Sequence, residues 1–304
     1  MADTHGTEAS VFGEGELKVD FISSVDAWHS SRPPKPLFIA APMAGGEYPV
    51  VLFFHGFEIL NVDYKQLFGH IASHGFIVVA PQLYITPLES AEMEIRDAVK
   101  VADWISSGLK SLLPTGVNPN LHKIALAGHS RGGHTAFSIA LGRDTKPSIN
   151  FSALIGVDPV AGTSKSSQIK PEILDFKRGS FELDMPVMVI GSGLGEERMG
   201  LLLPPCAPKG VNHAEFYNEC RPKCCYFVVK DYGHTDMLDD DALKLTKCVC
   251  KSGKTREPMR RSVGGLAVAF LRAYLEGEKG ELLGIVKEPQ IAPAELNPAV
   301  LREV

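Results

Sequence analysis

The chain alternates between short, almost uninterrupted apolar runs and longer segments in which apolar residues recur at helical spacing. Strands that are apolar on both sides are typical of a parallel sheet covered by helices on both faces. The short runs therefore predict the central strands of such a sheet. They lie at residues 49–54, 76–80, 123–127, 152–157, 186–190 and 225–229.

The longer segments predict helices between these strands. Strand followed by helix, repeated along the chain, indicates a mostly parallel, doubly wound α/β sheet with helices on both faces. Two earlier apolar runs, at residues 17–22 and 36–40, are expected to add antiparallel edge strands. The predicted helices cover residues 64–74, 90–112, 133–141 and 262–275.

The whole chain, residues 1–304, is expected to form one α/β domain, because no repeat, Gly/Ser linker or shift in composition divides it. Two stretches interrupt the alternation. Residues 162–183 are polar, and residues 195–222 are rich in Pro, Gly and Cys. Long connections of this kind usually cover functional sites, so we expect loop or lid insertions there.

Charge and hydropathy exclude several partners. The net charge of −5 provides no basic field to attract nucleic acid. No run of 18 apolar residues is present, so no transmembrane segment is expected, which leaves peripheral contact with a membrane open. The acidic N-terminal stretch resembles neither a secretory signal nor an Arg-rich transit peptide.

The strongest chemical motif follows the apolar run at residues 123–127. Gly128-His129-Ser130-Arg131-Gly132-Gly133 matches the G-x-S-x-G nucleophile elbow, with a strand before it and a helical pattern after it. Glycines are needed there because the serine occupies a strained turn packed closely between strand and helix. Ser130 is therefore the candidate nucleophile of an α/β-hydrolase fold.

A serine hydroxyl needs a base and an acid that orients the base, and on this fold the chain order is Ser, acid, His. His234 follows the run at residues 225–229 by a short turn and is favoured as the base over His213, which lies in an insertion. Asp158, directly after a strand and before a proline, is favoured as the acid over the alternatives Glu196 and Glu197.

The oxyanion of a tetrahedral intermediate needs hydrogen-bond donors. His55-Gly56-Phe57 ends the first long apolar run, and a turn there would aim the backbone N–H of Phe57 into the site. The second donor would be the N–H of Arg131, directly after the nucleophile. We expect His55 to fix this loop by hydrogen bonding rather than to act as a base.

The six cysteines all lie in the last third of the chain and do not have the spacing of zinc ligands. Cys224 and Cys225 are adjacent, and one residue separates Cys248 from Cys250. Free thiols or one or two local disulfides are therefore predicted, and no metal site.

Several of these motifs together resemble the plant chlorophyllases, α/β-hydrolases that cleave the phytyl ester of chlorophyll. The resemblance rests on Gly-His-Ser-Arg-Gly-Gly, His-Gly-Phe, Val157-Asp158-Pro159-Val160, Tyr232-Gly233-His234 and the cysteine-rich insertion, and it extends over nearly the whole chain. It implies a triad of Ser130, Asp158 and His234, which resolves the choice of acid.

The resemblance further implies chlorophyll as the substrate, with chlorophyllide and phytol as products and no added cofactor. It places the protein inside a plant cell, in the chloroplast. A flat, greasy macrocycle needs a broad apolar pocket. Candidate lining residues are Phe57, Ile59, Leu60, Tyr84, Ile85, His129 and residues 201–203.

Two other functions are compatible with the same motifs. A general carboxylesterase or cutinase-like polyester hydrolase would carry an identical triad, because fold and triad do not encode the acyl group. A non-catalytic member of the fold that binds a hydrophobic ligand is the third reading. An intact set of Ser130, Asp158 and His234 argues against it.

Overall fold

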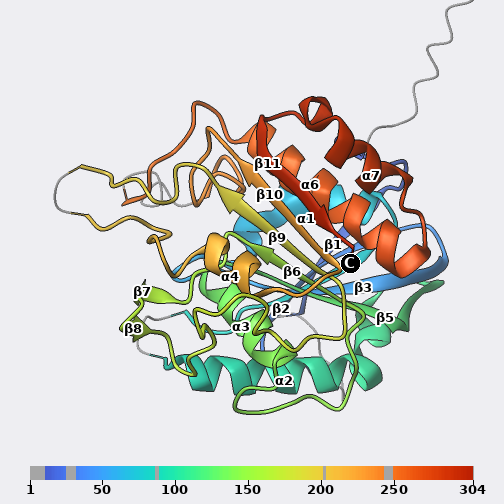
Figure 1. The fold of residues 1–304 in the computed structure, drawn as a ribbon. Coiled ribbons are helices and arrows are strands. Elements are labelled where there is room, and N and C mark those ends of the chain that lie inside the picture. Colours follow the sequence, from blue (N-terminus) through green and yellow to red (C-terminus); the bar gives the residue numbers. More distant parts are fainter. Residues whose placement is uncertain (1–10, 25–31, 86–88, 201–202, 243–248, 304) are drawn as a thin grey trace, which may run out of the picture.

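Nine strands form one sheet in the computed structural model, which describes residues 11–24, 32–85, 89–200, 203–242 and 249–303 (Figure 1). Their spatial order is β1-β2-β4-β3-β5-β6-β9-β10-β11. The strands are β1 (Val19–Ser23), β2 (Leu37–Pro42), β3 (Gly46–Phe54), β4 (Ile77–Pro81), β5 (Val117–His129), β6 (Ala153–Val157), β9 (Val187–Ser192), β10 (Cys224–Val229) and β11 (Leu296–Arg302).

The centre of the sheet, from β4 to β10, is parallel. All six predicted central strands are confirmed there. Strands β4, β6, β9 and β10 are buried along their whole length, as is β3 from Pro49 onward. A strand covered on both faces must be apolar at every position, which is why the uninterrupted runs located it.

The two edges of the sheet are antiparallel. On one side β1 pairs with β2, and β2 pairs with β4, which confirms both predicted edge strands. On the other side β11 pairs with β10 and was not predicted. Most of β11 is exposed or half-buried and it contains Pro298, so it carries no continuous apolar run.

Helices cover both faces of the sheet (Figure 1). One apolar layer packs the sheet against α1 (Lys65–Ser73), α6 (Glu257–Leu271) and α7 (Gly280–Lys287). The opposite layer involves α2 (Ala91–Gly108), α3 (Arg131–Ala140) and α4 (His213–Glu219). The four predicted helices are confirmed as α1, α2, α3 and α6, although α6 begins five residues earlier than expected.

These features confirm the α/β-hydrolase fold. The predicted insertions hold short elements: a hairpin of β7 (Gly162–Ser164) and β8 (Ser167–Gln168) in the first, and α4 in the second. In the described parts of the chain, no helix is both long and apolar enough to cross a membrane. The same residues hold no cluster of three metal-ligating side chains.

Candidate active site

Ser130 lies in a sharp turn between the end of β5 and the start of α3. Its backbone has φ 56° and ψ −122°, a strained conformation for a residue with a side chain. A Cβ on Gly128 would lie 2.1 Å from the carbonyl oxygen of Gly132, and one on Gly132 would lie 2.2 Å from that of Phe54. Only glycine fits at these two positions, so the motif reflects close packing around the serine.

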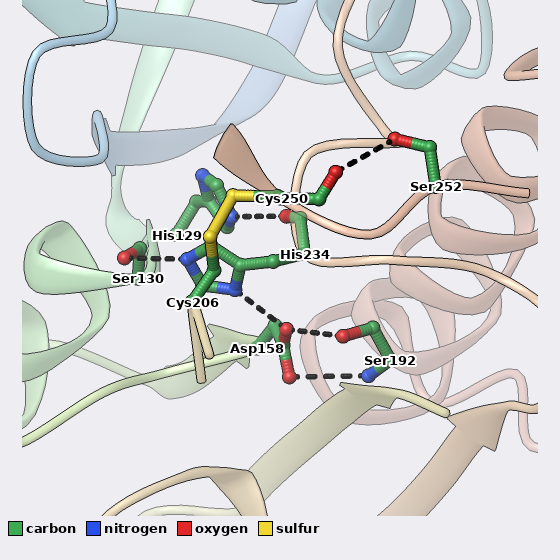
Figure 2. The surroundings of a disulfide bond; sticks show 8 residues. All are labelled: His129, Ser130, Asp158, Ser192, Cys206, His234, Cys250 and Ser252. Carbon is green, nitrogen blue, oxygen red and sulfur yellow. Dashed lines mark hydrogen bonds and ion pairs between the residues drawn. A yellow bond between two sulfur atoms is a disulfide. The ribbon is translucent and has the colours of Figure 1, made fainter. Parts of the chain in front are cut away.

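The carboxyl ends of three parallel strands bring Ser130, Asp158 and His234 together (Figure 2). His234 Nε2 lies 2.8 Å from Ser130 Oγ, and His234 Nδ1 lies 2.6 Å from Asp158 Oδ2. Asp158 is fully buried, and Ser130 and His234 are 8% and 5% exposed. The three residues thus form a Ser–His–Asp arrangement with hydrogen-bond geometry.

Asp158 is held by Ser192 at the end of β9. The backbone N–H of Ser192 donates to Oδ1 at 3.1 Å, and its hydroxyl donates to Oδ2 at 2.5 Å. Burial alone would raise the pKa of Asp158, but the hydrogen bond and charge of His234, with Ser192 and His213, lower it to about 2. An ionised Asp158 accepts a hydrogen bond from the Nδ1–H of His234, which leaves the Nε2 lone pair to accept from the serine hydroxyl.

The alternative acid and base occupy other positions. Glu196 accepts a hydrogen bond from the Asn212 side chain at 2.9 Å. His213 lies on the far side of the carboxylate, with Nε2 3.8 Å from Asp158 Oδ1 and Nδ1 2.9 Å from the Tyr226 hydroxyl. Among the described residues, no hydrogen bond joins His213 to Ser130. The geometry therefore favours His234 and Asp158.

The loop after β3 lies against the nucleophile. A Cβ on Gly56 would be only 3.3 Å from Ser130 Cβ. His55 donates from Nδ1 to the Gly56 carbonyl at 2.9 Å, while its Nε2 accepts from the backbone N–H of Leu83 at 3.0 Å. Its pKa is lowered to about 4 by burial, so the ring is neutral. His55 therefore fixes the loop, as predicted.

The backbone N–H groups of Phe57 and Arg131 remain the predicted oxyanion donors. Within the described chain, no backbone hydrogen bond uses the N–H of Phe57 or of Arg131. The His55 contact holds the Gly56–Phe57 peptide by its carbonyl, and the trans peptide directs the Phe57 N–H the opposite way. Arg131 begins α3, where N–H groups have no partner within the helix.

The side chain of Arg131 is held by a buried carboxylate that sequence reasoning missed. Glu94 on α2 accepts from Arg131 Nε at 2.7 Å and from the Thr135 hydroxyl at 2.6 Å. Burial raises the pKa of Glu94 to about 7, against the opposing effect of Arg131. The sequence did contain a signal for it, because Glu94 is spaced to share the buried face of the predicted helix with Ala98 and Val101.

A cavity of about 500 Å³ opens onto Ser130. Residues of both predicted insertions contribute to its walls, together with Phe57 and Arg131. Its lining is mostly apolar, with two arginines. The lining residues are Phe57, Ser130, Arg131, Val160, Gly162, Thr163, Ile169, Arg198, Pro204, Pro205, Cys206 and Pro208.

The remaining predicted pocket residues lie in different surroundings. Leu60 and Ile85 are 38% and 76% exposed, and their contact with a substrate stays a prediction. Tyr84 is buried, with the Arg131 guanidinium 4.9 Å from its ring centre. The prediction for His129 is wrong: its side chain is completely buried behind His234, because β5 turns it into the sheet core. Residues 201 and 202 lie outside the described residues.

A disulfide joins Cys206 to Cys250 beside His234 (Figure 2). It links the second insertion, at the cavity wall, to the segment before α6. The prediction of free thiols or one or two local disulfides is confirmed in part, because a disulfide and free thiols are both present but the bridge joins cysteines 44 positions apart. Cys220, Cys224 and Cys225 are free and buried, and Cys248 lies outside the described residues.

Comparison with known proteins gives consistent matches over the chain. The Chlorophyllase family model matches residues 7–303. Chlorophyllase-1 of Arabidopsis thaliana is 51% identical over 93% of this chain and 88% of its own length, and chlorophyllase-2 of the same plant is 51% identical over 84% and 82%. A Citrus unshiu protein named "Chlorophyllase-1, chloroplastic" is 45% identical over 88% and 81%.

These matches cover both the elbow at Ser130 and the strand ends that carry Asp158 and His234. The resemblance seen in the motifs therefore extends over nearly the full sequence. The chain belongs to the chlorophyllase family.

Proposed function

We propose that this protein hydrolyses the phytyl ester of chlorophyll through an acyl-enzyme formed on Ser130. One observation carries the proposal: a continuous hydrogen-bonded path from Ser130 through His234 to Asp158, at the mouth of a cavity, in a chain of the chlorophyllase family. The relatives' names give the substrate, and the triad gives the chemistry.

In the first half of the reaction, Ser130 Oγ attacks the carbonyl carbon of the propionate ester. His234 Nε2 takes the hydroxyl proton as the new C–O bond forms. Ionised Asp158 stabilises the resulting imidazolium and keeps its ring in place. The oxyanion is stabilised by the N–H groups of Phe57 and Arg131.

The tetrahedral intermediate then collapses. The bond to the phytol oxygen breaks, and His234 returns its proton to that oxygen, so phytol leaves as a neutral alcohol. Water then attacks the acyl carbon while His234 Nε2 takes one of its protons. The bond between that carbon and Ser130 Oγ breaks, and His234 returns the proton to Oγ, so chlorophyllide leaves and Ser130 is restored. The steps use only groups of the chain, the substrate and one water molecule, and the magnesium ion belongs to the substrate.

The mouth of the cavity suits a greasy substrate delivered from a lipid phase. We assign five exposed apolar residues to this mouth: Phe57, which lines the cavity, Met199 and Leu203, which are next in sequence to the lining residues Arg198 and Pro204, and the predicted pocket residues Leu60 and Ile85. They expose between 37% and 76% of their surface. Exposed apolar side chains at one opening favour contact with a hydrophobic surface. We propose peripheral membrane contact here, and a chloroplast location, since the Citrus relatives are named chloroplastic.

The test is release of phytol from purified chlorophyll by the purified protein. Wild type should produce chlorophyllide and phytol in equal amounts, and Ser130→Ala should lose activity by about 10³-fold or more because the nucleophile is gone. Equal turnover by wild type and Ser130→Ala would overturn the mechanism.

The same assay separates the general esterase alternative. Rates with chlorophyll are compared with those for a short p-nitrophenyl ester and a polyester. Fast hydrolysis of the small ester with none of chlorophyll would support a general carboxylesterase and contradict the proposed substrate.

A further inference from the structure

A buried hydrogen-bond network connects the loop of His55, Gly56 and Phe57, called the oxyanion loop below, to the backbone of His234. The N–H of Gly56 donates to the Tyr64 hydroxyl at 3.0 Å. The Tyr64 hydroxyl lies 2.7 Å from His129 Nδ1, and His129 Nε2 lies 2.8 Å from the carbonyl oxygen of His234. Tyr64 and His129 are both fully buried.

The two backbone groups at the ends of this network determine which group donates and which accepts in each hydrogen bond. A backbone N–H can only donate, so the Tyr64 oxygen accepts from Gly56 and sends its own proton to His129 Nδ1. A backbone carbonyl can only accept, so His129 Nε2 carries the proton toward His234. His129 is therefore a neutral ring in one tautomer, in accord with the burial that lowers its pKa to about 3.

Tyr64 also belongs to the part of the chain that anchors the segment after His234. The backbone N–H of Asp239 donates to the Asp63 carbonyl at 2.8 Å. The Asp239 carboxylate accepts from the backbone N–H of Gln66 at 2.9 Å. The stretch from Asp63 to Gln66 thus contacts two functional segments. Tyr64 contacts the oxyanion loop, and the backbone of Asp63 and Gln66 contacts Asp239 in the segment after His234.

We propose that Tyr64 and His129 are positioning residues that keep the oxyanion loop and His234 in register with Ser130. The inference rests on the proposed function, because it assigns catalytic roles to Phe57 and His234. Neither positioning residue touches the substrate. They act by holding two backbone segments, far apart in sequence, at one separation.

Tyr64→Phe is the most conservative test, since it removes only the hydroxyl at the centre of the network. We expect kcat for a short p-nitrophenyl ester to fall by roughly 10- to 100-fold, because loss of oxyanion-type contacts has effects of this size or larger. KM should change by less than about twofold, because no substrate contact is lost. The rate of labelling by a fluorophosphonate should fall in parallel.

Two substitutions at His129 test its two hydrogen bonds separately. The amide nitrogen of His129→Gln occupies about the position of Nε2 and can still donate to the His234 carbonyl, whereas His129→Leu cannot. We expect Gln to recover part of the activity that Leu loses. Nitrogen-15 spectra of the wild-type ring should show a protonated Nε2 and an unprotonated Nδ1 that do not change between pH 5 and 8.

Matched controls separate positioning from general loss of packing. His70→Gln removes another buried imidazole that contacts a backbone carbonyl, that of Val11 at 2.7 Å. Tyr48→Phe removes a hydroxyl that donates to the Ala44 carbonyl. Both should keep wild-type kcat even if their melting temperatures fall.

The outcomes distinguish this inference from the proposed function. If wild type is not labelled and hydrolyses no ester, the proposed function fails. If wild type is active and Tyr64→Phe retains its kcat and labelling rate, the positioning role is wrong. The double variant Tyr64→Phe/His129→Leu should be no slower than His129→Leu alone, and strictly additive losses would also contradict one shared network.

Discussion

The site has two regions that differ in burial: the frame, formed by the triad and the residues that hold it, and the mouth, formed by the exposed apolar residues proposed above. In the frame, Asp158 and His234 have hydrogen-bond partners on both sides, and little of either reaches solvent. At the proposed mouth, apolar side chains such as Leu60 and Ile85 are exposed to solvent. Bond making requires fixed atoms, whereas admission of a large pigment requires an adaptable apolar surface.

Arg131 and the disulfide connect the two regions. The backbone of Arg131 belongs to the frame, while its guanidinium lies 5.4 Å from the ring centre of Phe57 at the mouth. Cys206 lines the cavity, and its partner Cys250 lies beside His234 (Figure 2). Substitutions in the frame should therefore affect every ester, and those at the mouth should affect chlorophyll selectively.

The largest effect is expected for Asp158→Asn. The amide cannot hold the His234 tautomer that leaves Nε2 free, so kcat should fall by about 10³- to 10⁴-fold with every ester. Glu196→Gln is the matched control, because its carboxylate contacts Asn212 instead. Steady-state kinetics measure both. A larger loss for Glu196→Gln than for Asp158→Asn would contradict the assignment of the acid.

The next largest effect is expected on stability, when the disulfide between Cys206 and Cys250 is removed. Cys206→Ser opens a loop closed over a sequence separation of 44 residues, and the unfolding free energy should fall by about 4 kcal/mol in the chain-entropy description. Denaturant unfolding measures this change. Adding reductant should destabilise the wild type and leave Cys206→Ser unaffected. Equal stability of oxidised and reduced wild type would contradict a structural role for the bridge.

Glu94, which holds the Arg131 side chain between frame and mouth, should make the free energy of unfolding depend on pH. Its pKa rises from 4.5 unfolded to about 7 folded, so its stabilising contribution is complete below pH 4.5 and is lost as the pH rises through 7. Between pH 5 and 8, wild type should lose roughly 2–3 kcal/mol of unfolding free energy relative to Glu94→Gln. Parallel stability curves for the two proteins would show that Glu94 does not titrate this way.

The smallest effect is expected at the mouth. A charge introduced by Ile85→Asp should raise KM for chlorophyll in lipid vesicles by roughly tenfold, because an apolar contact is replaced by a hydrated carboxylate. Turnover of a water-soluble p-nitrophenyl ester should not change. If both substrates are affected equally, Ile85 belongs to the frame rather than to the mouth.

The sequence predicted most of the sheet because its central strands are buried on both faces, and it located Ser130 because the elbow admits only glycine at Gly128 and Gly132. It missed β11, an edge strand whose pairing needs no apolar run. Edge strands are defined by the neighbour they meet, which local pattern does not encode.

The supporting residues of the site were missed for a similar reason. Ser192, Glu94 and Tyr64 each contact at least one residue that lies 34 or more positions away in the chain. His129 was predicted to line the pocket, but its side chain is fully buried and contacts the Tyr64 hydroxyl and the His234 carbonyl instead. Neighbours in the motif thus face opposite regions of the protein.

Identification of the nucleophile tests the central claim most directly. Wild type treated with a fluorophosphonate should yield one modified peptide, with the adduct on Ser130 Oγ, detected by mass spectrometry after proteolysis. His234→Ala should label at least about 100-fold more slowly, because the hydroxyl loses its base. An adduct on a different residue, or undiminished labelling of His234→Ala, would contradict a serine hydrolase built on these three side chains.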